Sequence, residues 1–264
     1  MEYYMKKRNY LNNKDILAEI HKSKTTYCSF TLPEYHQYDA IIPLNGEISE
    51  QIIADGKKAR AKRLDIPEDT ITLQDLIFRV MTYDHIPNEP GRKKNPKTIA
   101  DHKVKLNFPP FQHWKYDEDD NFVCAGKSHW DGDLDTGTFS LIHGSTTDKL
   151  AIMWMKLCDR YGTKGNVRGY TYNDEMKGQA ILQLAQIGLQ FDESKSSNPF
   201  AYYTAAVTNS FVRIINIEKK NQSIRDDILE MNNMNPSYTR QAEGEWAMGL
   251  KREQEFQEQS STSY

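Results

Sequence analysis

The chain has 264 residues, of which 27% are charged, and its formal net charge is −3 at pH 7. This length is enough for one large or two small domains, and the slightly acidic balance excludes a global basic field, so any nucleic-acid site must be a local patch. Three scattered cysteines exclude a disulfide framework. Because no window resembles a signal peptide or reaches transmembrane length, we expect a soluble intracellular protein.

The first part of the chain predicts short helices separated by turns. Residues 10–24 predict a helix with Asn13 as its N-terminal cap. Segments 45–65 and 72–85 predict two further helices, in which apolar residues recur at helical spacing. The stretch 86–98 is basic and punctuated by proline, which is typical of a loop.

Residues 111–141 alternate aromatic and polar side chains around Asp, Asn and Gly turns, which predicts β hairpins in a meander. Histidines and aspartates between residues 102 and 135 also allow an alternative function, a metal-dependent DNA nuclease or other DNA-processing enzyme. However, no CxxC or HxxxH spacing occurs, and "DGDLDTG" at 131–137 is more typical of a turn and bulge. We therefore expect no metal, no other cofactor and no catalytic residue.

Three longer helices are predicted in the second part of the chain. They cover residues 147–162, 174–191 and 198 to about 231. Short loops join them, and their apolar stripes can bury a bundle core, in which we expect Trp154, Leu157 and Leu184. The exposed side of the second helix is rich in glutamine, and such a face suits a protein partner and is equally compatible with simple solvation.

Four ordered blocks of this sequence resemble a known family. They are "NYLNNKDILAEI" near the start, "RGYT" at 168–171, "GLQFDESKSSNPFAYYTAAVTNSF" at 188–211 and "IEKK" at 217–220. The chain resembles the late-transcription sigma factors of T-even-type bacteriophages and cyanophages, which are similar to region 2 of bacterial sigma factors. With the cyanophage type the resemblance runs nearly end to end.

The resemblance implies a non-enzymatic transcription initiation factor that binds the host RNA polymerase core and directs it to phage late promoters. In such modules the second helix docks on the clamp helices of the largest polymerase subunit. The polymerase-binding residues that the resemblance implies are Asp174, Glu175, Gln179, Gln183 and Gln186. Further candidate partners are a phage coactivator and a sliding clamp, and the implied location is the cytoplasm of the infected bacterial host.

The third helix is implied to read a minus-ten-like promoter element as a melted non-template strand. Such capture requires planar rings, hydrogen-bonding groups for base edges and cations for phosphates, all of which this helix supplies. The candidate DNA-binding residues are Tyr202, Tyr203, Thr204, Thr208, Asn209, Ser210, Arg213, Lys219 and Lys220. Tyr203 is equally compatible with the core, and the two lysines are also compatible with a role at the C-terminal dipole of the helix.

The chain departs from the family pattern on this helix and in its tail. Ala206 and Val207 stand where primary sigma factors have two consecutive tryptophans, so the wedge at the melting fork is in doubt. The C-terminal residues lack the acidic, hydrophobic motif that binds the sliding clamp in the T-even-type proteins. Clamp binding therefore does not carry over residue by residue.

The predicted fold class is mainly α, a sigma-region-2-like helical bundle with an inserted α+β segment of short helices and a β meander. The predicted parts are an N-terminal helix at 1–26, the insertion at 27–145, the helical domain at 146–231 and a polar C-terminal tail at 232–264. We expect the insertion to buttress the helical domain, or to contact polymerase or a coactivator. A third possible function is a helical protein that only docks on polymerase.

Overall fold

The computed structural model describes residues 11–87 and 106–261, so most of the predicted basic loop at 86–98 lies outside the described residues. The chain divides into two compact units, residues 1–207 and 208–264, and the division falls within helix α5 (Pro199–Met231). Each unit is described by itself below. Within the described residues, no helix combines the length and apolar character needed to cross a membrane.

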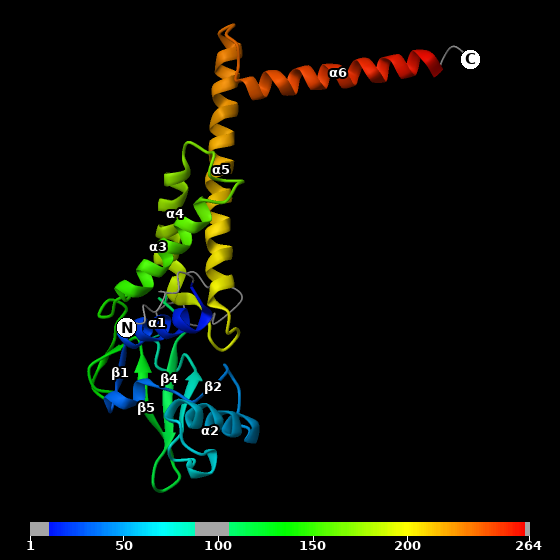
Figure 1. Ribbon diagram of the computed structural model, residues 1–264. Helices are drawn as coiled ribbons and strands as arrows, with labels where there is room; N and C mark the ends of the chain where they lie inside the picture. The colour runs from blue at the N-terminus through cyan, green and yellow to red at the C-terminus, as the bar shows by residue number, and fades with distance from the viewer. Residues whose placement is uncertain (1–10, 88–105, 262–264) are drawn as a thin grey trace, which may run out of the picture. The chain divides into compact units, whose positions relative to one another are not determined.

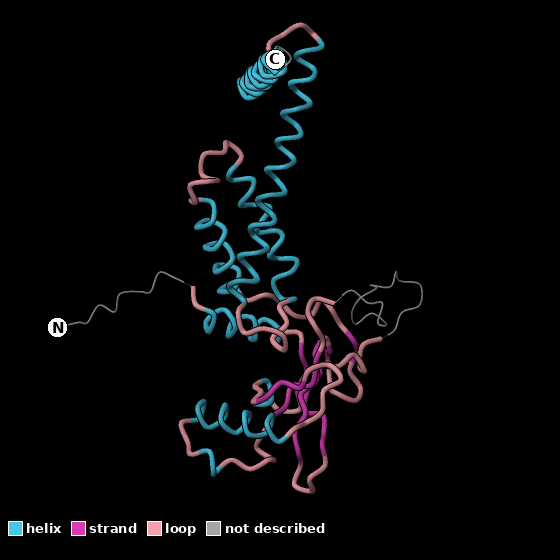
Figure 2. The backbone as a smooth tube through the Cα atoms, turned by 90° about the vertical axis from the view of Figure 1, so that its right-hand side faces the viewer, coloured by secondary structure: helices cyan, strands magenta, loops and turns pink. Residues whose placement is uncertain are grey.

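The first unit contains a mixed five-stranded sheet (Figures 1 and 2). Its strand order is β1-β5-β4-β3-β2, with β2 and β3 parallel and the other neighbours antiparallel. The strands are β1 (Cys28–Phe30), β2 (Ala40–Ile42), β3 (Ile77–Met81), β4 (Phe111–Tyr116) and β5 (Phe122–Ser128). A separate two-stranded ribbon, β6 (Trp130–Asp131) with β7 (Thr138–Phe139), completes the predicted meander.

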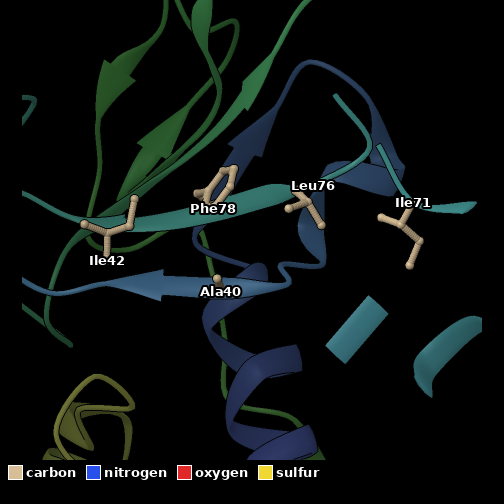
Figure 3. Packing of buried hydrophobic residues seen from close by; sticks show 5 residues of the cluster. All are labelled: Ala40, Ile42, Ile71, Leu76 and Phe78. Carbon is tan, nitrogen blue, oxygen red and sulfur yellow. The ribbon is translucent and has the colours of Figure 1, made fainter. Parts of the chain in front are cut away.

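Helix α2 (Glu50–Leu64) packs against the β2 side of the sheet. It begins at Ser49, whose side chain accepts a hydrogen bond from the backbone N–H of Ile52. The buried apolar cluster beside it comes from β2, β3 and the segment before β3. Figure 3 shows its members, Ala40, Ile42, Ile71, Leu76 and Phe78.

Helix α1 (Asn13–Thr25) lies between the sheet and helix α3 (Asp148–Gly162) (Figures 1 and 2). Asn12, not the predicted Asn13, caps α1, and the Asn13 side chain instead accepts a hydrogen bond from the N–H of Phe200 at the start of α5. Asn13 therefore links the beginnings of two helices that are far apart in sequence.

Helix α4 (Asn173–Ile187) packs against α3 and continues into a short 3-10 turn, η3 (Gly188–Gln190). Trp154, Leu157 and Leu184 are all buried, as the sequence predicts. Gly188 lies so close to the Trp154 ring that an added Cβ would come within 2.1 Å of it. This close approach explains why a residue without a side chain stands where α4 ends.

A carboxylate buried between two cations links three segments of the first unit. Glu193, in the loop between η3 and α5, accepts hydrogen bonds from Lys24 of α1 at 2.9 Å and from Arg79 of β3 at 2.9 Å. The Tyr38 hydroxyl donates a third at 2.6 Å. Burial opposes ionisation of Glu193, but the charges of Lys24 and Arg79 and the Tyr38 hydrogen bond outweigh it, so its pKa lies below the ordinary value.

Arg79 is itself only 2% exposed, and its guanidinium contacts two aromatic rings and three hydrogen-bond acceptors. Its guanidinium lies 3.9 Å from the ring centres of both Tyr38 and Phe111, and it donates to the Nδ1 of His21 at 2.9 Å and the Nε2 of His113 at 3.1 Å. Because a guanidinium only donates, both acceptor nitrogens are unprotonated, which fixes the tautomers of the two rings. Burial, and then the charge of Arg79, lowers the pKa of His21 to about 3 and that of His113 well below its usual value.

The predicted mainly-α fold class is wrong, because the chain is 52% helical and 12% strand and contains a mixed five-stranded sheet as well as a two-stranded one. The error centres on the predicted helix at 72–85, which contains β3. Three consecutive residues of that strand, Ile77, Phe78 and Arg79, are buried. A strand buried on both faces loses the alternation that distinguishes it from a buried helix.

The second unit contains helix α6 (Tyr238–Ser261), where the sequence predicts only a polar tail. Asp226 of α5 accepts hydrogen bonds from both the N–H and the hydroxyl of Ser237, the residue immediately before α6. Arg240 adds ion pairs with Asp227 and Glu230. These contacts fix the beginning of α6 on the end of α5.

Replacing Glu193 with Gln should lower the free energy of unfolding by about 3–5 kcal/mol, because it leaves two buried cations without their anion. Chemical denaturation at pH 7 measures this difference. The matched control is Glu47→Gln on the surface, which should change stability by less than about 0.5 kcal/mol. Equal, small effects of the two substitutions would contradict a structural role for the buried carboxylate.

Stability should also fall as the pH decreases below 6.5. The folded-state pKa values of His21 and His129 are about 3 and that of His113 is also depressed, so between pH 6.5 and about 3 the unfolded chain binds protons that the folded chain does not. Each such histidine contributes a slope of about 1.4 kcal/mol per pH unit. Urea denaturation between pH 7.5 and 5.5 tests this, and His21→Gln, which retains an acceptor for Arg79, should reduce the slope. Identical slopes for the two proteins would contradict the assignment.

Candidate functional site

Helix α4 is oriented by its buried face and by the turn that precedes it. Met176, Ala180 and Leu184 are buried, each with 0% exposure. The Asn173 side chain donates to the carbonyl oxygens of Gly162 and Val167, both at 3.0 Å, and so ties the start of α4 to the end of α3. The opposite face of α4 is therefore held toward solvent.

That face carries four residues in one line, Glu175, Gln179, Leu182 and Gln186, which we call the α4 stripe. Their spacings of four, three and four residues place them on one side of a helix. All four are exposed, and Leu182 has 57% of its surface exposed. The stripe is an apolar side chain among neutral amides with an acid at its N-terminal end.

The other predicted polymerase-binding residues lie beside the α4 stripe. The Asp174 side chain is 96% exposed and pairs with Lys177 at 2.9 Å, and Gln183 is half-buried. Leu182 was not among the predicted residues, although its spacing of seven residues from Glu175 places it on the same face. An exposed leucine can be recognised as a candidate contact only after the buried face of the helix is known.

Tyr202 and Tyr203 lie at the start of α5, within the first unit, and both are anchored. Tyr203 is 1% exposed, and its hydroxyl donates to the carbonyl oxygen of Gly188 at 2.8 Å. Its ring meets Trp154 edge to face at a centroid distance of 5.9 Å. Tyr202 is half-buried, its hydroxyl donates to the carbonyl oxygen of Ile187 at 3.1 Å, and its ring packs on Phe191.

The two tyrosines therefore connect α5 to the end of α4 instead of presenting free rings. Burial raises the pKa of both hydroxyls, which keeps them protonated as donors to the α4–η3 backbone. Tyr203 has no exposed face on which a base could stack, and Tyr202 has only part of one. The candidate aromatic platform is thus largely a packing contact.

Beyond Val207, in the second unit, α5 exposes a second line of polar residues. Asn209, Arg213, Asn216 and Lys220 follow the same spacing of four, three and four residues, and all four are exposed. We call this line the α5 stripe; Asn216 was not among the predicted residues. The remaining predicted DNA-binding residues divide by exposure: Lys219 is exposed, whereas Thr204, Thr208 and Ser210 are half-buried.

The histidines and aspartates of the alternative nuclease site do not gather around one point. His102 lies outside the described residues. His113 accepts from Arg79 through Nε2 and donates from Nδ1 to the Tyr35 carbonyl at 2.6 Å, so neither nitrogen is available to a metal. Asp131 and Asp133 belong to the ribbon and its turn and are exposed. Within residues 11–87 and 106–261, no group of three or more His, Cys, Asp or Glu side chains could hold a metal ion.

No protein-family model, curated protein or solved structure matches the chain.

Removing the Tyr203 hydroxyl should destabilise the protein while leaving its ring in place. Tyr203→Phe leaves the Gly188 carbonyl without its buried donor, which should cost about 1–3 kcal/mol in the free energy of unfolding. Tyr202→Phe is the matched comparison and should cost less, because its half-buried site admits water. Chemical denaturation measures the free energy of unfolding of both variants. A Tyr203→Phe variant as stable as the parent would contradict the anchoring role.

Proposed function

We propose that the chain is a sigma-type transcription initiation factor that acts without enzymatic activity. It binds the host RNA polymerase core through the α4 stripe and contacts promoter DNA through the α5 stripe. The observation that carries this proposal is that α4 and α5 each expose the face that would contact the partner. The two helices on which the sequence resemblance places polymerase and DNA contacts each keep a continuous exposed line of side chains, all of them polar except Leu182 on α4.

The composition of the α4 stripe suits a protein interface. Neutral amides lose less hydration energy on burial than charged groups do, and the cores of interfaces are correspondingly depleted in charge. Leu182 supplies an apolar contact near the centre of the line. Its side chain is 57% exposed, and a partner could cover this surface. Glu175, at one end, complements a basic partner surface such as the clamp helices of polymerase.

The composition of the α5 stripe suits contacts with nucleic acid. Asparagine amides both donate to and accept from base edges, and arginine and lysine neutralise phosphates. The anchored tyrosines shift the proposed mechanism away from base stacking. Recognition of a minus-ten-like element in the melted non-template strand would instead depend on Asn209, Arg213 and Asn216, with Lys220 holding the backbone.

The proposed setting is the cytoplasm of an infected bacterial host, with phage late promoters as the DNA. Interactions with a phage coactivator or a sliding clamp would fit the same role. The sheet-containing segment at 27–145 supports the helices through the Arg79–Glu193 contact. Contacts of this segment with polymerase or a coactivator would fit the same role.

Making the α4 stripe positively charged should weaken polymerase binding. Glu175→Lys combined with Gln179→Lys should reduce affinity for core polymerase by about tenfold or more, because like charges would then face a basic surface. Asp159→Lys, at an exposed position on α3, is the matched control. Pull-down with core polymerase and a thermal melt are measured together, and unchanged binding in the double variant would exclude this face as the docking site.

Removing the cations of the α5 stripe should weaken DNA binding without impairing polymerase binding. Arg213→Ala with Lys220→Ala should flatten the dependence of log affinity on log salt concentration by about 0.7–0.9 per lost phosphate contact. Lys251→Ala on α6, also exposed, is the control. Promoter binding by the polymerase complex is titrated at several salt concentrations. A slope identical to that of the control would refute phosphate contacts by this stripe.

A further inference from the structure

A pocket separate from both stripes opens beside the buried Glu193 cluster. It has a volume of about 500 Å³ and lies between α1, the segment around Tyr38, the end of α2 and the loop that precedes α5. Its lining includes the apolar residues Leu17 and Ile41 and the polar residues Ser196 and Ser197. This size and mixed lining are typical of small-molecule sites.

One wall of the pocket offers a hydrogen-bond donor with a fixed direction. Arg79 donates to the Nδ1 of His21, so the neutral His21 ring carries its proton on Nε2. That N–H has no hydrogen-bond acceptor in the part of the chain that the structure describes, and His21 lines the pocket. Burial and the charge of Arg79 lower the pKa of His21 to about 3, so the ring is neutral at pH 7, and the Arg79 bond to Nδ1 leaves Nε2–H as its donor.

Three ion-pair clusters with excess positive charge each contribute one residue to the pocket wall. Each cluster contains one buried carboxylate bonded by two cations: Glu19 by Lys22 and Lys149, Asp39 by Arg60 and Arg63, and Glu193 by Lys24 and Arg79. Six cations against three carboxylates leave an excess of three positive charges. The residues that these clusters contribute to the wall are Lys22, Arg63 and Glu193. Glu193 is paired with Lys24 and Arg79, and Lys22 and Arg63 each share their carboxylate with a second cation.

We propose that this pocket binds a nucleotide, with its phosphate toward His21, Lys22 and Arg63 and its base against Tyr38 and the apolar wall. A positive wall selects an anion, the fixed N–H of His21 provides one directed bond to an acceptor oxygen, and the flat apolar side accepts a ring. The nucleotide could be free in solution or belong to a single strand. This site is independent of the proposed sigma-type function.

Calorimetric titration of the full chain with AMP, adenosine and inorganic phosphate at low salt tests the proposal. AMP should bind at least about tenfold more tightly than adenosine, because the positive wall acts only on the phosphate. Lys22→Gln should weaken AMP about fivefold, whereas Lys14→Gln, on the same helix but outside the pocket, should change it less than about twofold. Ala18→Trp, at a residue that lines the pocket, should abolish binding by filling the pocket.

Competition with a short single-stranded oligonucleotide identifies the source of the nucleotide. Displacement of AMP by the oligonucleotide indicates a nucleotide of a strand, and retention of AMP indicates a free nucleotide; both support the site. Thermal melts confirm that each variant is folded. Equal binding of AMP and adenosine, equal losses in Lys22→Gln and Lys14→Gln, binding of inorganic phosphate alone as tightly as AMP, or no AMP binding at all would overturn the proposal.

Discussion

The buried carboxylate of Glu193 is the constraint on which the arrangement of the first unit depends. It joins Lys24 of α1, Arg79 of β3 and the loop before α5, three segments that are far apart in the sequence. A buried ion is costly unless it is paired, so a structure without the Glu193 loop would leave two buried cations without their anion. The sheet and the helices are therefore coupled through electrostatics as well as through apolar packing.

This coupling has consequences for the surfaces that face outward. The loop that carries Glu193 leads directly into α5, and the hydroxyls of Tyr202 and Tyr203 hold the start of α5 against the end of α4. Once these positions are set, the α4 stripe is left exposed. The tyrosines that an isolated sequence suggests as a base-stacking platform serve instead to orient the helix that bears them.

The sequence predicted helices α3 to α5 and the meander, but it missed β3 and α6, for identifiable physical reasons. Helix α3 has strong amphipathic periodicity and a capping threonine, so its bounds are predicted to within a residue. Strand β3 is buried on both faces and contains Arg79, whose partners lie at distant positions, so no local pattern reveals it. Similarly, the exposure of Leu182 and the burial of Tyr203 depend on which helices pack together, which periodicity alone does not determine.

Run-off transcription with the host core polymerase on phage late promoters is the decisive experiment for the proposed initiation role. A sigma-type factor should yield a transcript that starts at a defined position, appears only when the protein is added, and is lost on a template with a scrambled upstream melting element. A protein that binds the core polymerase but yields no promoter-dependent transcript would contradict the proposed initiation role.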